Sequence, residues 1–470
     1  MDAIYTKDAV AIAAEVHSGK TTARAVTEAS LARIEALNPL LNAFTEVTRE
    51  RALSEADAVD QSVASGENPG PLAGVPDAVK NLFDLEGVVT LAGSKMHREQ
   101  APAAVDAAAV AKLKAAGAIC LGALDMDEYA YGFTTENTHY GTTRNPHNLA
   151  HVAGGSSGGS AAAVTSGMVA LALGTDTNGS IRVPAAFCGI FGLQATYGRF
   201  SRKGAFLFAE SFDRIGPFTR SARDAALCFD VLQGGDVADP VCLEASLPEL
   251  TPQMDSGIAD LKIARAGGYF EKKGLPEVFA GVDLVAEALD VSEKVEIPDV
   301  AAARGAAYVI TGTEGGNFHL HNLRKRAADF DPIVRDRFLA GCLIPSAWYL
   351  KAQKFRAIYQ KAVLQIFEKY DVILAPTTPT PATRADQETM CLDGVDIPVR
   401  ANIGIYTQPL SYVGLPIISV PVRRPGALPV GVMLVAAPHN EAALLRVARH
   451  LEKQGTICAD TVEPDPSTAV

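Results

Sequence analysis

The sequence predicts an α/β fold in which helices cover both faces of a sheet. Two observations lead to this class. Apolar runs typical of buried strands, at 76–83, 119–124 and 168–173, alternate with helical patterns at 107–116 and from the 154–160 run to about residue 166. The composition, with 48% hydrophobic and 20% charged residues among 470, is that of an ordinary globular protein.

A helical segment precedes this alternation. Two helical patterns lie between residues 6 and 37 and are separated at Gly19. The second is expected to stop before Pro39, because proline disrupts a helix interior. A third helix is expected at 49–63, followed by a turn rich in glycine and proline at 66–71.

After the central alternation, the pattern from about 237 to 345 is looser and predicts a peripheral lobe. A long helix at 347–369 then leads to strands that we expect to rejoin the sheet, at 372–375, 417–422 and 430–434. We interpret the chain 1–470 as one interrupted domain with these parts: a helical N-terminal segment 1–66, a core 67–236, a peripheral lobe 237–345, a return to the sheet 346–458 and a tail 459–470.

Charge and cysteine usage narrow the class of protein. The formal net charge is −12, and the only compact basic run is 324–326, which disfavours direct binding of nucleic acid. No apolar stretch reaches the roughly 18 residues of a membrane helix, and the polar N-terminus does not resemble a secretory signal. The seven cysteines are scattered and odd in number, which indicates reduced thiols. These features predict a cytoplasmic location.

A dense glycine and serine run, Gly-Gly-Ser-Ser-Gly-Gly-Ser at 154–160, is the most informative local feature. A flexible linker would not run between apolar segments straight into a helix. A phosphate-binding loop would be followed by Gly-Lys-Ser/Thr, which is absent. Glycines here are expected to let the backbone pass close to a substrate or to adopt positive φ. Ser180 follows Ser156 by 24 residues, within the run 176–184.

A serine nucleophile needs a base, and histidine is the first residue type to consider. Three histidines, at 139, 147 and 151, lie near the run, but no Gly-x-Ser-x-Gly motif surrounds any serine. His319 and His321 would share one face of a strand and raise a metal site as an alternative. Without an HExxH motif, we interpret them as a satisfied or exposed pair rather than zinc ligands.

Three motifs in order resemble the amidase signature family: Lys80 at the end of the run 72–80, the serine-rich run at 154–160 and the run Asp-Thr-Asn-Gly-Ser-Ile-Arg-Val-Pro at 176–184. The resemblance implies a large mixed central sheet. It also implies that Ser180 is the nucleophile, Ser156 a bridging serine on a cis peptide bond and Lys80 the terminal base, with no metal and no organic cofactor.

Physical chemistry is compatible with these roles. Burial lowers the pKa of a lysine, so a neutral amine can accept a proton near pH 7. The backbone N–H groups of the loop that leads to the nucleophile, namely Thr177, Asn178, Gly179 and Ser180, are the expected oxyanion donors. The family usually has glycine at the position of Asn178, where asparagine tolerates left-handed geometry better than most residues. Asp176 and Ser157 are expected to hold the loop by hydrogen bonds.

The runs 126–141 and 180–184 resemble one branch of the family, the 1-carboxybiuret hydrolases of cyanuric acid and s-triazine degradation. This resemblance implies release of ammonia from a small anionic ureido compound. Arg337 resembles the position that holds a carboxylate in the glutamine-hydrolysing subunits of amidotransferases. Tyr131 and Tyr308 are candidates to line the pocket.

Other functions remain open from the sequence. The chain resembles the glutaminase subunit of a tRNA-dependent amidotransferase, and hydrolysis of another acyl urea such as oxalurate is a further alternative. A scaffold without activity is disfavoured because all three relay residues are present. The resemblance also implies a small helical partner protein, and either a homodimer or a heterotetramer, with no membrane and no direct nucleic-acid partner.

Overall fold

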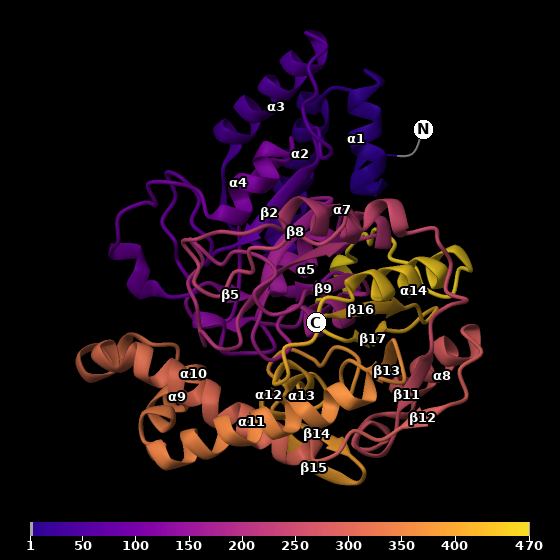
Figure 1. Cartoon of the computed structure of the whole chain (residues 1–470). Helices are drawn as coiled ribbons and strands as arrows, with labels where there is room; N and C mark the ends of the chain where they lie inside the picture. Colours follow the sequence, from indigo (N-terminus) through magenta and orange to yellow (C-terminus); the bar gives the residue numbers. More distant parts are fainter. Residues whose placement is uncertain (1–2, 470) are drawn as a thin grey trace.

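The computed structural model describes residues 3–469, so Met1 and Asp2 of the predicted N-terminal segment and Val470 of the predicted tail lie outside the described residues. An 11-stranded mixed sheet runs through the middle of the molecule (Figure 1). Its strands, in spatial order, are β1 (Phe44–Val47), β3 (Ile119–Leu124), β2 (Pro76–Lys80), β8 (Leu171–Asp176), β10 (Arg214–Thr219), β9 (Phe191–Gln194), β16 (Ile417–Val422), β17 (Val430–Ala436), β13 (Val372–Pro376), β11 (Ile263–Ala266) and β12 (Lys294–Val295).

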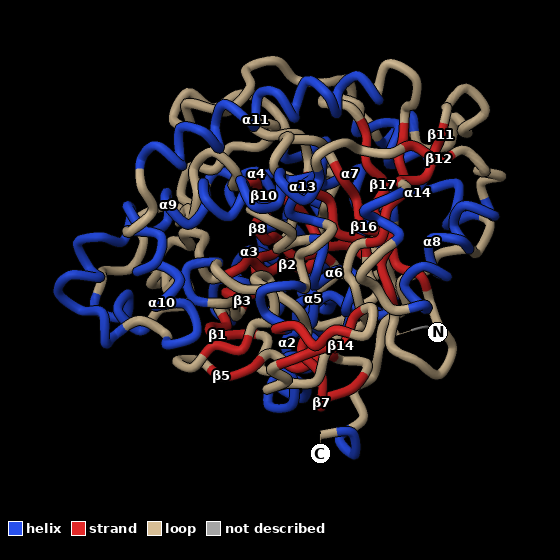
Figure 2. Tube along the Cα trace, turned by 90° about the horizontal axis from the view of Figure 1, so that it is seen from below, coloured by secondary structure: helices blue, strands red, loops and turns tan. Residues whose placement is uncertain are grey.

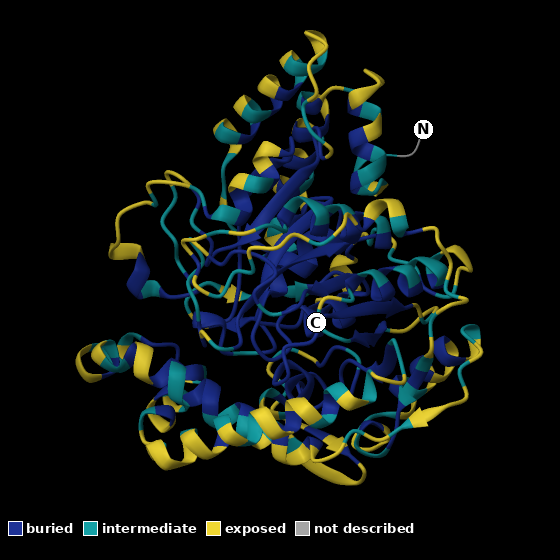
Figure 3. Cartoon of the chain, viewed as in Figure 1, coloured by how far each residue is buried: buried dark blue, intermediate teal, exposed yellow. Residues whose placement is uncertain are grey.

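Helices cover both faces of this sheet, as the sequence predicts. The helices α5 (Gly158–Thr165) and α6 (Arg182–Cys188) pack on each other and on the central strands. The helices α7 (Ala222–Leu232) and α14 (Glu441–Lys453) pack together on several of the same strands from the opposite side. Strands enclosed in this way are apolar along their whole length, and Figure 3 shows the sheet as the buried centre of the molecule.

The N-terminal helices are α1 (Ala9–His17), α2 (Ala23–Leu41) and α3 (Arg49–Ala64), and α4 (Ala108–Ala115) follows β2. The prediction that the second helix stops before Pro39 is wrong, because α2 continues through this residue to Leu41. A proline this close to the helix end removes one hydrogen bond, to the carbonyl of Glu35, and Glu35 is exposed to water. Asn42 then ends the helix with φ of 51°.

The segment 237–345 contains more regular structure than its loose pattern indicates. It holds α8 (Pro276–Ala288), the 27-residue helix α9 (Val300–Arg326) and α10 (Pro332–Cys342), and its strands β11 and β12 extend the main sheet. Glycines that obscure the helical pattern let α9 and α10 approach closely, since a Cβ on Gly341 would lie 2.0 Å from the carbonyl oxygen of Gly312. The division of the chain into parts stays a prediction.

The placement of His319 and His321 on one strand face is wrong. Both residues lie on α9, where positions two apart point in directions about 200° apart. His319 is buried and packs against Tyr129, whereas His321 is exposed. Within residues 3–469 no group of three or more histidine, cysteine, aspartate or glutamate side chains is arranged to hold a metal ion.

The C-terminal part returns to the sheet through β13, β16 and β17, as predicted. The helix α11 (Ser346–Ile366) precedes it and lies with α9 and α10 at one side of the molecule (Figures 1 and 2). The remaining elements are α12 (Val399–Asn402), α13 (Thr407–Ser411) and three small hairpins, β4 (Glu136–Asn137) with β5 (Gly141–Thr142), β6 (Arg144–Asn145) with β7 (Asn148–Val152), and β14 (Thr389–Leu392) with β15 (Val395–Pro398).

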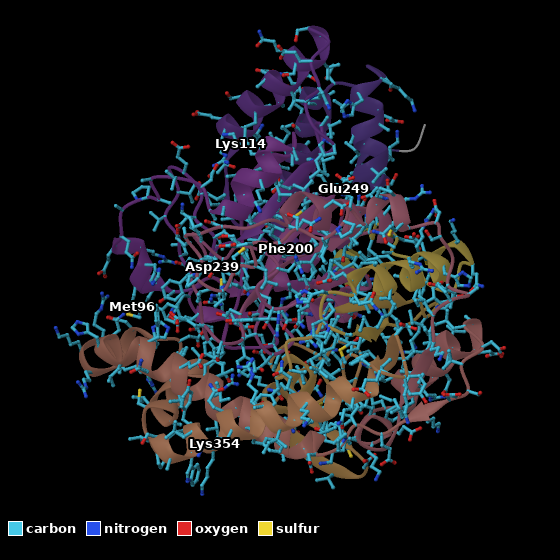
Figure 4. All side chains as sticks on the ribbon, viewed as in Figure 1. Met96, Lys114, Phe200, Asp239, Glu249 and Lys354 are labelled. Carbon is cyan, nitrogen blue, oxygen red and sulfur yellow. The ribbon has the colours of Figure 1, made fainter. Side chains whose placement is uncertain are left out.

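Side chains divide between the interior and the surface as these layers require. Phe200 is labelled near the middle of Figure 4 and is 4% exposed, whereas Lys354 on α11 lies at the outer edge of the same view and is exposed. All seven cysteines are free. In the described part of the chain, no helix combines the length and the apolar character needed to cross a membrane.

Candidate active site

The candidate site lies where two neighbouring parallel strands end. β2 and β8 pair in parallel, Lys80 is the last residue of β2, and Asp176 is the last residue of β8. The residues that follow β8 therefore emerge at the same edge of the sheet as Lys80. This edge, outside the carboxyl ends of parallel strands, is where α/β proteins commonly bind their ligands.

Lys80 is fully buried and contacts two hydroxyl groups. Its Nζ donates to Ser156 Oγ at 2.7 Å and to Thr175 Oγ1 at 3.0 Å. Burial lowers the pKa of Lys80 to about 7, although the carboxylates of Asp127 and two other aspartates act in the opposite direction. A substantial fraction of this lysine is therefore a neutral amine near pH 7, which is able to accept a proton.

The serine-rich run places Ser156 beside this amine. The peptide bond between Gly155 and Ser156 is cis, as the family resemblance implies. Ser157 lies immediately before α5, and its Oγ donates to the backbone carbonyl of Thr175 on β8 at 3.3 Å. Ser157 thereby ties the run to the strand that carries the next part of the site, which agrees with the expectation that it supports the loop.

Asp176 organises the loop that leads to Ser180. Its carboxylate accepts from the backbone N–H groups of Gly179 at 2.7 Å and Ile181 at 3.1 Å. Arg182 forms a bidentate pair with the same carboxylate, with both distances 3.0 Å and both side chains fully buried. Burial alone would raise the pKa of Asp176, but the Arg182 guanidinium outweighs it and holds this pKa below its usual value.

Glycine is required at position 179 rather than 178. Gly179 has φ of +137°, and a Cβ there would lie 2.3 Å from Thr407 Oγ1. Asn178 does not have positive φ, and its carbonyl oxygen accepts from Thr407 Oγ1 at 2.7 Å. The expectation of strain at Asn178 is therefore wrong, because the unusual conformation belongs to the next residue.

The set of expected oxyanion donors is reduced by one. The Gly179 N–H already donates to Asp176, so it is not free to bind an oxyanion. Among residues 3–469 no acceptor is hydrogen-bonded to the backbone N–H of Asn178 or of Ser180. The side chain of Thr177 donates to Asp213 at 2.5 Å, which anchors the start of the loop.

Ser180 lies between this loop and α6 and is 2% exposed. Its Oγ makes no hydrogen bond to any described residue. The Lys80–Ser156 half of the expected relay is therefore formed, whereas the link from Ser180 to Ser156 is not. Hydrogen bonds of this kind often close only when substrate is bound.

Arg337 and Tyr131 come together although they are distant in the sequence. The Arg337 guanidinium lies 3.9 Å from the centre of the Tyr131 ring, and its Nη1 donates to the Tyr131 backbone carbonyl at 2.9 Å. No carboxylate within residues 3–469 forms an ion pair with Arg337. Tyr308 instead donates its hydroxyl to the carbonyl of Ala401 at 2.7 Å.

Asp127 is a site residue that the sequence reasoning missed, although it lies in the run 126–141. It is 3% exposed, and its backbone N–H donates to the carbonyl of Ser156 at 3.3 Å. One carboxylate oxygen accepts from the Thr135 N–H at 3.1 Å, and the other has no partner among the described residues. Burial raises the pKa of Asp127 to about 6. A Cβ on Gly155 would lie 2.1 Å from the unpaired oxygen, so glycine next to Ser156 makes room for this carboxylate.

Comparison with known proteins decides the family. The family model described as Amidase matches residues 25–445. The chain belongs to the amidase family. An amidase relative from Pseudomonas sp. (strain ADP), the AtzE subunit of 1-carboxybiuret hydrolase, is 50% identical over 443 residues, which cover 94% of this chain and 97% of the relative. Another relative, from the glutamyl-tRNA(Gln) amidotransferase of Chromohalobacter salexigens, is 39% identical and covers 96% of this chain and 97% of its own.

Solved structures of amidase signature enzymes share the fold. A complex described as vestigial, which reveals the evolutionary origins of an s-triazine catabolic enzyme, contains a chain with a TM-score of 0.95 and 48% identity, covering 97% of this chain and 100% of that one. A chain of the glutamyl-tRNA(Gln) amidotransferase from Thermotoga maritima has a TM-score of 0.80 and 30% identity, covering 94% and 95%. The expected family and the mixed sheet are thus confirmed, and the chain is a hydrolase of amide C–N bonds.

Proposed function

We propose that this amidase releases ammonia from 1-carboxybiuret or a closely related anionic ureido compound, through an acyl-enzyme on Ser180. The hydrogen bond of 2.7 Å between Lys80 and Ser156, in a fully buried site beside the loop 177–180, supports the chemistry. The 50% identity to a protein of 1-carboxybiuret hydrolase supports the substrate.

The relay moves one proton in each direction. Ser180 rotates to donate its proton to Ser156, which passes its own proton to the neutral amine of Lys80. The Ser180 oxygen then bonds to the amide carbon, and the carbonyl electrons move onto oxygen, where the N–H groups of Asn178 and Ser180 stabilise the charge. As the C–N bond breaks, the proton returns through Ser156 to the leaving nitrogen, and ammonia departs.

Water completes the reaction by the same route. It attacks the acyl carbon while Ser156 and Lys80 take up its proton, and the returning proton goes to Ser180 as the carboxylic product leaves. Arg337 provides the binding energy for the substrate carboxylate, because its guanidinium is held against Tyr131 and has no acidic partner within the described residues.

The proposal includes a cytoplasmic enzyme that works with a small helical partner protein, in a homodimer or a heterotetramer. Two comparisons support an assembly: one structural relative comes from a protein complex, and another relative is named as one of the subunits of an amidotransferase. A partner that completes the assembly would explain an isolated chain of low activity.

The test is ammonia release by the purified protein, alone and with a co-expressed small partner, without ATP or tRNA. The substrates are 1-carboxybiuret, biuret, oxalurate, glutamine and an aryl amide. Fast release from a carboxylated ureido compound, abolished in Ser180→Ala, is the expected result. Release from glutamine alone would instead identify a glutaminase, the alternative supported by the amidotransferase relatives. Activity of Ser180→Ala close to that of the unmodified protein would contradict the mechanism.

A further inference from the structure

The side chain of Asn178 carries an unused hydrogen-bond acceptor inside the site. Asn178 is 7% exposed, and its Oδ1 is buried without a partner among residues 3–469. Buried polar atoms are nearly always hydrogen-bonded, because leaving one unpaired is costly. An acceptor that lacks a partner two residues before the proposed nucleophile therefore points to a donor on the substrate.

The orientation of this side chain is fixed by its neighbours. Asn178 Nδ2 donates to Thr311 Oγ1 on α9 at 3.3 Å. The Thr311 hydroxyl donates its own proton to the Ala307 carbonyl at 2.9 Å, so towards Asn178 it acts only as an acceptor. The amide therefore directs its nitrogen to α9 and keeps Oδ1 on the other side. Thr407 holds the backbone of the same residue.

The chemistry of the two candidate substrate classes differs next to the scissile carbonyl. A ureido compound has N–H groups on both sides of this carbonyl, whereas glutamine and other alkyl amides have a CH₂ group on the side that does not leave. A carbonyl oxygen in the protein can bind the first arrangement and gains nothing from the second. A site built to bind a donor also rejects the analogue that lacks it, because its buried acceptor stays unpaired.

We propose that Asn178 is the residue that selects ureido substrates, with its Oδ1 accepting a hydrogen bond from the substrate N–H on the non-leaving side of the scissile carbonyl. This inference rests on the proposed function and adds the specificity of the same site. Asn178 binds substrate in this role, while the proton relay is left to Lys80, Ser156 and Ser180.

Biuret and malonamide test it, because they differ only by N–H against CH₂ at the central position. Their inhibition constants are measured against turnover of 1-carboxybiuret, so neither has to be a substrate. In the unmodified enzyme biuret should bind about 10- to 100-fold more tightly than malonamide. In Asn178→Leu and Asn178→Gly this preference should fall to near unity, with little change for malonamide.

A second measurement covers variants with too little turnover for competition. Calorimetric binding of both compounds is repeated with Ser180→Ala protein, with and without the Asn178 substitutions. Thr311→Val should reduce the preference for biuret by freeing the amide, and Thr313→Val is its control, because Thr313 bonds only the Val309 carbonyl on the same helix.

The outcomes separate the two proposals. Equal binding of biuret and malonamide by the unmodified protein, or a preference that survives both Asn178 substitutions, would overturn the role of Asn178 while ammonia release from 1-carboxybiuret still stands. Absence of ammonia from every ureido compound, with release from glutamine, would remove the proposed function and this inference together.

Discussion

Lys80 Nζ lies 2.7 Å from Ser156 Oγ, and both residues are fully buried. A lysine usually stays charged and solvated, but here its nearest groups are hydroxyls and not carboxylates. The low polarity of the surroundings shifts the amine towards its neutral form, which both donates and accepts hydrogen bonds. The pair can therefore pass a proton in either direction, and the consequences can be measured.

Removing any member of the relay should stop the chemistry without unfolding the protein. We expect Ser180→Ala to abolish ammonia release and Ser156→Ala or Lys80→Ala to lower kcat by about 10⁴-fold or more. Ser160→Ala is the matched control, because this buried serine of the same run only donates to the Leu173 carbonyl. A Lys80→Ala enzyme with most of its activity would contradict the assignment of the base.

The pH dependence should report the protonation of Lys80. Its pKa is lowered to about 7, so the amine is protonated and inactive as a base below this pH. We expect kcat/KM to rise by about tenfold per pH unit below the midpoint and to level off above it. Steady-state rates from pH 5 to pH 9 test this, and a rate that stays flat through pH 7 would exclude a lysine base with this pKa.

Asp127 should raise the midpoint of that profile. Its carboxylate favours the charged form of Lys80, and removing the charge should make the amine easier to deprotonate. We therefore expect Asp127→Asn to shift the acid limb of kcat/KM to lower pH. Asp283→Asn, on the exposed face of α8, serves as the charge control. An unchanged midpoint in an active Asp127→Asn enzyme would show that this carboxylate does not influence the base.

Arg337 should affect carboxylated substrates selectively. Arg337→Ala removes the guanidinium, and Arg337→Lys keeps the charge but loses the planar fork. We expect both changes to raise KM for 1-carboxybiuret by about 10- to 100-fold and to change KM for uncharged biuret far less. Arg335→Ala on the same helix is the control, since Arg335 pairs with its neighbour Asp336. Equal losses for both substrates would indicate a structural role for Arg337.

The Asp176–Arg182 pair should matter for stability as well as for activity. Either Asp176→Ala or Arg182→Ala leaves a buried charge without its partner, and we expect about 3–5 kcal/mol of destabilisation. Arg326→Ala breaks the exposed pair with Glu99 and should have little effect. Urea denaturation measures all three, and a change in the Asp176 variant no larger than in the Arg326 control would contradict the role given to this pair.

Local patterns in the sequence determined the fold class, most of the strands and the three relay residues. The strands are visible because their apolar runs are buried on both faces, and β3 and β16 have the predicted bounds. Lys80, Ser156 and Ser180 are recognisable because each lies in a short motif whose backbone shape needs particular neighbours, such as Gly179 with its positive φ.

Other features depended on contacts between residues far apart in the chain. Arg337 and Tyr131 are 206 positions apart, and the tether of Asn178 to Thr311 spans 133. The glycines of α9 weaken its helical pattern because they serve its packing on α10, which no local rule reveals. Asp127 became part of the site only when the fold placed its carboxylate beside Gly155. A side chain's partners, and hence its pKa and its free hydrogen-bonding atoms, are properties of three-dimensional packing, so only the tertiary structure decided them.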